Sequence, residues 1–235
     1  MSRRFVLNCL IIRVLTFSII GKMHKKENMR PERVMRLDYN QEDLLQLNLS
    51  NDNPDLKKVE DQDQLAAYIQ EKLRSENKKY AIGGYGENRS VYQQFKHFDT
   101  EESGRSIHLG IDFWAAAGSV IQAPFYSKVH SWAFNDNPGD YGGTLILEHP
   151  QEDLFSLYGH LGLKELEGLN KGTEFKAGEP IARVGLFNEN GGWPPHLHFQ
   201  LIKDLGSWVG DYPGVVAPDE AELYLQNCPN PVAFF

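Results

Sequence analysis

The 235-residue chain has little cysteine, no excess of basic charge and no long uninterrupted apolar run. Its two cysteines, Cys9 and Cys228, lie near opposite ends, so they form neither a disulfide framework nor a cysteine-type metal site. The net charge of −8 gives a nucleic-acid partner no electrostatic support and disfavours a strongly anionic substrate. We find no internal repeat and no low-complexity tract. What remains is a globular composition, 41% hydrophobic and 24% charged, sufficient for a good core and an appendage.

Residues 1–35 begin with basic residues and contain an apolar run over residues 5–20, a pattern that resembles a signal peptide or a short membrane anchor. Arg13 interrupts this run, no small-x-small cleavage site follows it, and the run is short for a membrane span. Alternative starts are offered by Met23, Met29 and Met35. We therefore interpret residues 1–35 as a signal or anchor, or as a mis-assigned start. A cell-envelope or secreted location is favoured over a cytoplasmic one, and membrane contact is expected only if the run is a real anchor.

Residues 36–80 are polar and acidic and are predicted to form a partly helical N-terminal extension. Within them, Leu65, Ile69 and Leu73 recur at helical spacing. This spacing predicts an amphipathic helix over residues 61–74. Its simplest role is to pack against the main domain that follows.

From about residue 81 the chain changes character. Short β-type runs alternate with glycine, proline and asparagine, in the order SIHLGIDFW, SVIQAP, SKVHSWAF, GGTLILEH, LFSLYGHL, EPIARVG and HLHFQLI. Their spacing favours an antiparallel sheet, sandwich or barrel over βαβ units. We therefore predict a mainly β domain over residues 81–210. Residues 211–235 are predicted to be a C-terminal tail that packs on this domain.

Histidine is concentrated in the same region, because only His24 of the eight histidines precedes it. In HLGID, His108 and Asp112 are residue types that suit zinc. On a straight strand they would lie about 13 Å apart, too far to share one ion. Gly110 between them therefore predicts a bulge or bend that brings the two side chains together.

Two further stretches, PPHLHFQL and LFSLYGHL, place more histidines on strands. His196 and His198 share one strand face, and Tyr158 and His160 are predicted to share a face of another. A catalytic zinc commonly takes three protein ligands and leaves one position for water. The pair in HLGID and one member of the His-x-His pair would complete that set. His160 and the other member would then remain to move protons or stabilise charge.

The stretches HLGID, YGHL and PPHLHFQL, in this order, resemble the signature of the lysostaphin-type (LytM-like) zinc metalloendopeptidases. GGTLILEH and KGTEFKAGEPIARVG also match the pattern of that family, and the resemblance covers about residues 105–203. It implies a barrel-sandwich-like antiparallel β fold, built on a duplicated hybrid motif and containing a groove. The implied activity is endopeptidase cleavage of short peptide bonds, usually in peptidoglycan.

The same resemblance implies roles for particular residues. It implies one zinc ion per chain, held by His108, Asp112 and His198. It implies two catalytic histidines, His160 and His196. Their division of acid and base roles stays open, and Arg105 and Tyr158 are candidates for contacts with the substrate or the transition state. The expected partner is a peptide or peptidoglycan substrate, and the sequence does not define an oligomeric state.

Other function classes remain open. A non-catalytic LytM-type regulator would keep the fold and lose ligands, whereas here every ligand and catalytic position is filled. KGTEFKAGEPIARVG also suits barrel-sandwich hybrid folds that carry lipoyl groups or phosphohistidine. The acidic charge and the lack of a recognisable wall-binding repeat keep a further alternative open, a cytoplasmic relative that acts on a non-wall peptide.

Overall fold

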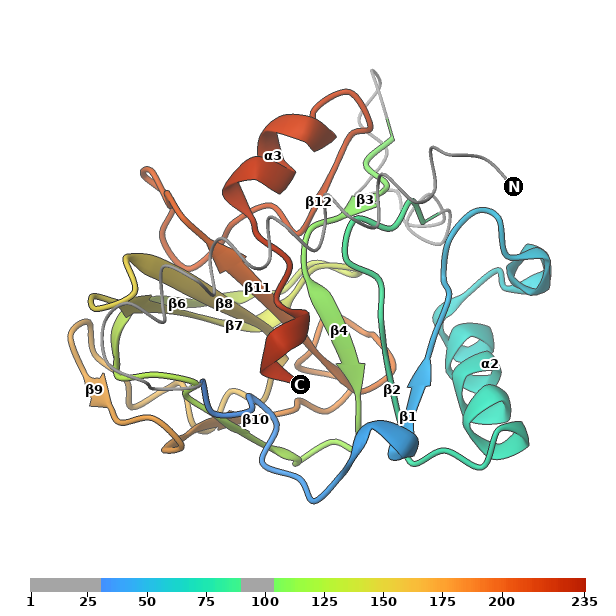
Figure 1. The fold of residues 1–235 in the computed structure, drawn as a ribbon, viewed down its shortest axis with the longest axis horizontal. Coiled ribbons are helices and arrows are strands. Elements are labelled where there is room, and N and C mark those ends of the chain that lie inside the picture. The colour runs from blue at the N-terminus through green and yellow to red at the C-terminus, as the bar shows by residue number, and fades with distance from the viewer. Residues whose placement is uncertain (1–30, 90–103) are drawn as a thin grey trace.

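The computed structural model describes residues 31–89 and 104–235, whose secondary structure is mainly β (Figure 1). The described helices are η1 (Gln41–Asp43), η2 (Pro54–Lys58), α2 (Gln62–Ser75), α3 (Ala221–Asn227) and η4 (Val232–Phe234). The described strands are β1 (Leu44–Gln46), β2 (Tyr80–Gly83), β3 (Ile107–His108), β4 (Ile111–Trp114), β5 (Val120–Gln122), β6 (Ser127–Asn135), β7 (Gly142–His149), β8 (Leu154–Leu161), β9 (Glu174–Phe175), β10 (Pro180–Arg183), β11 (His196–Ile202) and β12 (Val215–Val216). The mainly β fold class is confirmed. The apolar run over residues 5–20, predicted as a signal or anchor, lies outside the described residues.

One sheet of eight strands dominates the fold, in the order β1-β2-β4-β11-β8-β7-β6-β9. Its neighbouring strands are antiparallel except for β1 and β2, which are parallel. Two smaller sheets pair β5 with β10 and β3 with β12. Each of the seven β-type runs in the sequence contains an observed strand, because the alternation and turn residues that define them are local signals.

The alternation of side chains along β11 separates the two faces of the sheet. Leu197, Phe199 and Leu201 point into the main hydrophobic core. His196 and His198 point to the opposite face and are also buried. Because successive strand residues face opposite ways, one strand both anchors the core and presents the two imidazoles.

The C-terminal residues cover the core face of the sheet, and the chain end lies close to β4 in Figure 1. The Phe235 ring stacks on Phe113, with 5.5 Å between centroids and 11° between planes. Phe234 packs against Phe125 and Phe199 at 5.6 and 5.5 Å. Both C-terminal rings therefore belong to the main core.

The helix predicted over residues 61–74 is observed as α2, which lies beside β1 and β2 (Figure 1). The Asp61 side chain caps it by accepting a hydrogen bond from the backbone N–H of Gln64 at 2.8 Å. Leu65 and Ile69 are buried in a second apolar cluster, together with Trp114 of β4. Residues 36–80 also supply β1 to the large sheet, which helical spacing could not reveal. The division of the chain into domains at residues 35, 80 and 210 stays a prediction.

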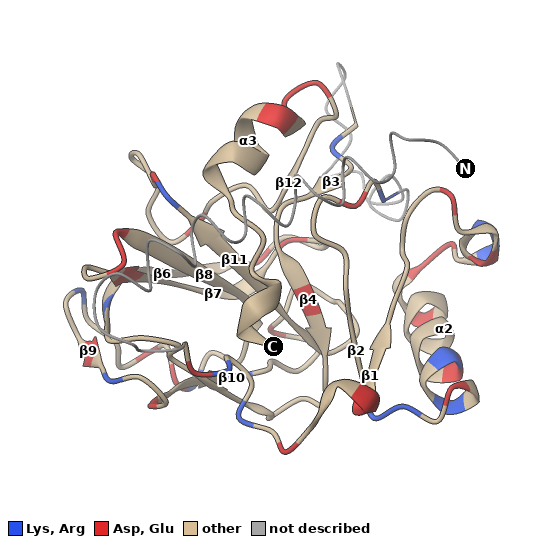
Figure 2. Cartoon of the chain, viewed as in Figure 1, with Lys and Arg blue, Asp and Glu red and all other residues tan. Residues whose placement is uncertain are grey.

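Charged residues lie mainly on α2 and the loops, and β4 carries a single acidic residue, Asp112 (Figure 2). Asp112 is almost completely buried, at 3% exposure. A buried carboxylate requires partners, so its surroundings define the candidate site. None of the helices among residues 31–89 and 104–235 has the length and apolarity needed to cross a membrane.

Candidate metal and catalytic site

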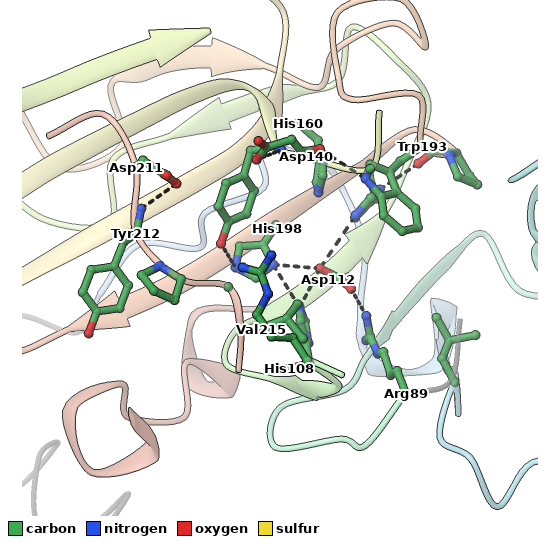
Figure 3. A pocket seen from close by; sticks show the side chains of 18 of the residues that line it. Arg89, His108, Asp112, Asp140, His160, Trp193, His198, Asp211, Tyr212 and Val215 are labelled. Atoms are coloured by element: carbon green, nitrogen blue, oxygen red, sulfur yellow. Dashed lines mark hydrogen bonds and ion pairs between the residues drawn. The ribbon is translucent and has the colours of Figure 1, made fainter. Parts of the chain in front are cut away.

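Three buried side chains converge on one point of the sheet, as Figure 3 shows. His108 Nε2 lies 2.9 Å from His198 Nδ1 and 3.3 Å from Asp112 Oδ1. His198 Nδ1 lies 3.2 Å from the same Asp112 oxygen. A tetrahedral zinc with bonds of about 2.0–2.1 Å places its ligand atoms about 3.3 Å apart. The triangle of one carboxylate oxygen and two imidazole nitrogens therefore fits a zinc ion.

Strand pairing and an interruption between β3 and β4 bring these residues together. Asp112 and His198 lie directly opposite each other in the β4–β11 pairing. The SIHLGIDFW run is interrupted at Leu109 and Gly110, so that β3 carries His108 into a pairing with β12 while β4 joins the large sheet. The bend predicted at Gly110 is observed.

Close packing, in addition to the bend, explains why residue 110 is glycine. The φ of Gly110 lies outside the left-handed region. Instead, a Cβ at this position would lie 2.7 Å from the Cε1 and Nε2 atoms of His198 and from the Phe199 carbonyl oxygen. Glycine is therefore required because β11 and the ligand ring approach the backbone closely, and not because of an unusual φ.

Outer hydrogen bonds fix the tautomers of both imidazoles in the triangle. His108 donates its Nδ1–H to the carbonyl of Gly84 at 3.1 Å, which leaves Nε2 as the acceptor toward the centre. His198 donates its Nε2–H to the Oε1 atom of Gln200 at 3.0 Å, which leaves Nδ1 toward the centre. Ligating histidines in metal sites are usually oriented in this way. Both imidazoles therefore direct an unprotonated nitrogen toward the carboxylate oxygen, as ligands of a cation would.

His160 reaches the same face because β8 contains a bulge. In the β7–β8 pairing, Gly143 lies opposite Leu161 and Leu145 lies opposite Tyr158, so β8 has one extra residue over this interval. His160 itself has a φ of 62°, in the left-handed region that residues other than glycine rarely adopt. Bulges re-aim side chains and are frequent next to active sites. The predicted shared face of Tyr158 and His160 is wrong, because the bulge turns His160 away from the core.

Tyr158 lies in the main core, away from the cluster. Its ring is fully buried against Phe199, and its hydroxyl accepts a hydrogen bond from Ser156 Oγ at 3.0 Å. The structure therefore does not bring Tyr158 to the site. Arg105, the other candidate for a substrate contact, does line the pocket that contains the cluster.

His160 and His196 lie side by side, with 4.1 Å between ring centroids. His160 donates its Nδ1–H to the Asn190 carbonyl at 2.8 Å, and His196 donates its Nδ1–H to the Pro194 carbonyl at 2.7 Å. In both rings Nε2 is therefore left as a proton acceptor, and His196 Nε2 lies 3.8 Å from Asp112 Oδ1. The two imidazoles thus lie beside the triangle of His108, Asp112 and His198, and their catalytic role stays a prediction.

Burial sets the charge of this cluster. It lowers the pKa of His196, and it lowers the pKa of His160 well below 6.5, with further lowering by His196 and His198. Burial and then Arg89 lower the pKa of His108 to about 4. Burial alone would raise the pKa of Asp112, but His108 and Arg89 outweigh it and hold that pKa well below its usual range. At neutral pH His108, His160 and His196 are thus neutral bases around an ionised carboxylate.

These residues line a pocket of about 160 Å³. Its walls include Tyr141, Trp193 and Trp114, whose indole stacks on the His196 ring at 5.6 Å and 20°. The other two histidines of the described residues lie elsewhere: His130 bonds Ser131, and His149 is buried against Ser156. His97 lies outside the described residues.

Sequence reasoning missed several residues of the site. Gln200 could have been found, because it follows His198 by two positions and so shares its strand face. Tyr141 is held between two glycines, since a Cβ at Gly159 or Gly214 would overlap its ring or hydroxyl. Arg89 had no local signal, because it lies 23 positions before its partner Asp112.

Part of the chain matches a known family of peptidases. Residues 106–209 match the family model described as Peptidase family M23. The L-Ala--D-Glu endopeptidase of Bacillus subtilis (strain 168) is 29% identical over 127 residues, which are 51% of this chain and 37% of that protein. This chain therefore spans little more than a third of that relative.

Solved structures of peptidases are also similar. The catalytic domain of the antimicrobial peptidase lysostaphin from Staphylococcus simulans is 20% identical, with a TM-score of 0.39, and the match covers 66% of this chain and 94% of that one. A zinc containing peptidase from Vibrio cholerae is 28% identical, with a TM-score of 0.34, over 44% of this chain and 29% of that one.

The predicted resemblance is confirmed over residues 106–209, which match the model of Peptidase family M23. The clustered residues His108, Asp112, His160, His196 and His198 all lie within this segment. Arg89 and Gly84, which contact two of them, lie before it.

Proposed function

We propose that the chain is a zinc-dependent metalloendopeptidase that hydrolyses short peptide bonds, with cross-link or stem peptides of peptidoglycan as its substrate. The observation that carries this proposal is the triangle of His108 Nε2, Asp112 Oδ1 and His198 Nδ1, with sides of 2.9 to 3.3 Å. Two more imidazoles with free Nε2 acceptors lie beside it in the same pocket. The substrate class is supported by the name of the Bacillus relative.

Zinc held by these three residues would supply Lewis-acid catalysis and an activated water. His160 and His196 would handle the protons. Because both rings are neutral and have Nε2 as an acceptor, either can take a proton from the attacking water. Protonation of one ring disfavours protonation of the other across 4.1 Å, so the pair holds one proton at a time and can return it to the leaving amine.

The alternatives make different demands on the site. A regulator that keeps only the fold does not need three ligands with fixed tautomers and two further histidines. A lipoyl or phosphohistidine carrier does not need a buried mixed N/O cluster. A peptidase that acts on a non-wall peptide would need the same site, so only the substrate separates it from the proposed function.

The test is metal analysis and substrate digestion with the purified full chain. We expect about one zinc per chain and release of defined peptides from purified, cross-linked peptidoglycan, identified by mass spectrometry. His108→Ala should lose both zinc and cleavage, whereas His160→Ala should lose cleavage alone. Absence of zinc after zinc loading would refute the metal assignment. Cleavage of synthetic non-wall peptides without cleavage of peptidoglycan would refute the substrate class.

A further inference from the structure

Residues 84–89 lie against the triangle of His108, Asp112 and His198. They follow β2 and precede the segment that matches the family model. The Gly84 carbonyl accepts the Nδ1–H of His108 at 3.1 Å. The backbone of His108 is also held from this side, since Gly86 N–H donates to the His108 carbonyl at 2.8 Å and His108 N–H donates to the Glu87 carbonyl at 3.0 Å. This segment therefore fixes both the ring and the backbone of one predicted zinc ligand.

Arg89 ends this segment and contacts a second predicted ligand. It is only 2% exposed, and its Nη1 donates to Asp112 Oδ2 at 2.6 Å. Its Nε donates to Glu87 Oε2 at 2.7 Å. Glu87 is anchored in turn, because its Oε1 accepts a hydrogen bond from the Leu49 N–H at 3.0 Å. The guanidinium is thus held between the buried carboxylate of Asp112 and the partly buried carboxylate of Glu87, in the planar geometry that arginine supplies and lysine does not.

The two oxygens of Asp112 consequently have different tasks. Oδ1 lies 3.2 to 3.3 Å from the ring nitrogens of His198 and His108. Oδ2 points to the other side, where Arg89 occupies it (Figure 3). A carboxylate with both oxygens available can bind a metal through one or through two of them. Binding through both oxygens would therefore have to compete with Arg89 for Oδ2, which favours Oδ1 as the ligand atom.

We infer that Arg89 is a positioning residue, which restricts Asp112 to a single ligating oxygen and so keeps a coordination position for water and the substrate carbonyl. This inference rests on the proposed function, because it assumes that the triangle holds zinc. The competing explanation is that Arg89 only neutralises the charges of Asp112 and Glu87. A neutralising charge would affect stability, but it would not set the coordination number.

The test uses the full chain with Arg89→Lys, which keeps the charge but loses the planar fork, and Arg89→Met, which loses both. Cobalt(II) replaces zinc as a spectroscopic probe, since its d–d absorption weakens as the coordination number rises above four. Zinc affinity is measured by competition with a chromogenic chelator. Arg33→Met serves as the control, because Arg33 bonds the Tyr39 carbonyl and stacks on its ring, away from the cluster.

We expect Arg89→Met to weaken zinc binding 10- to 100-fold, the usual effect of losing an outer partner of a ligand. We expect the cobalt spectra of both Arg89 variants to weaken and shift, while Arg33→Met keeps the wild-type spectrum. Arg89→Lys keeps the test decisive if Arg89→Met does not fold. A folded Arg89→Lys with wild-type zinc affinity and spectrum would overturn the inference, because a positive charge without the planar fork would then be enough to position Asp112. It would leave the proposed function standing. A wild-type chain that binds neither zinc nor cobalt would overturn the proposed function, and the inference with it.

Discussion

Substitution of Gly110 offers the sharpest test of the site geometry, because one added methyl group should reach a metal ligand. The alanine Cβ would lie 2.7 Å from two ring atoms of His198 and from the Phe199 carbonyl oxygen. Ordinary contacts begin at 3.4 Å, so the ring must retreat by about 0.7 Å. Metal–ligand distances tolerate only about 0.2 Å of deviation. Gly110→Ala should therefore displace a ligand rather than merely crowd the core.

We expect Gly110→Ala to weaken zinc affinity at least tenfold, which corresponds to about 1.4 kcal/mol. Gly110→Val should weaken zinc affinity further, since its branched side chain enlarges the overlap with His198. The measurement is competition with a chromogenic chelator, combined with circular dichroism to show that the β-sheet persists. Gly168→Ala is the matched control, because a Cβ at Gly168 meets no atom within 4 Å.

Wild-type zinc affinity in a folded Gly110→Ala would refute this reasoning. It would mean that His198 either moves without cost or does not ligate the metal. Loss of the β-sheet signal would instead locate the main damage at the Phe199 carbonyl.

Three further predictions follow from the same structure. His160→Ala and His196→Ala should keep zinc near the wild-type level and lower turnover about 100-fold, as measured by metal analysis and steady-state kinetics. Burial lowers the pKa of His149 to about 4, below its unfolded value of about 6.5, so its contribution to the free energy of unfolding should be complete above pH 6.5 and lost as pH falls toward 4. The loss is at most about 3 kcal/mol, and a comparison of wild type with His149→Gln in denaturant titrations across this range measures it. Phe235→Ala should lower the free energy of unfolding by about 3–5 kcal/mol, because it empties a stacked core position, and thermal unfolding checks this.

Each of these predictions has a contrary outcome. If His196→Ala loses zinc and His198→Ala keeps it, the roles of the pair are reversed. An equal pH dependence in wild type and His149→Gln would show that His149 does not titrate in this range. Val232→Ala, at a side chain 46% exposed in the same tail, is the control for Phe235, and equal effects of the two would contradict the core role.

Much of this fold could be predicted because its signals are local. The strands followed from two-residue alternation and turn residues, and α2 followed from the spacing of Leu65 and Ile69. The resemblance to a known family implied that His108, Asp112 and His198 act together, and Gly110 predicted the bend between the first two. These signals lie within a few residues of the features that they predict.

The rest depends on register and on contacts between distant segments. No periodicity marks the extra residue of β8, so the side on which His160 lies could not be read from alternation. Arg89 meets Asp112 through a segment whose backbone bonds to residues 106–108, and no local pattern marks that pairing. Strand β1 pairs with β2 in parallel across a helix, and its three residues, Leu-Leu-Gln, are too few to show an alternating pattern. In each case the sequence contains the residues, while their partners are set by tertiary structure.

The fixed tautomers described above also make the site visible to nuclear magnetic resonance. The imidazole protons bonded to Gly84, Asn190, Pro194 and Gln200 lie inside the protein, with donor–acceptor distances of 2.7 to 3.1 Å. Protons held in this way exchange slowly with solvent, so each should give a resolved signal that a freely exchanging imidazole lacks. Four such signals would report that the site has assembled, in the absence of any substrate. Loss of one signal in a variant would identify which imidazole has lost its hydrogen bond.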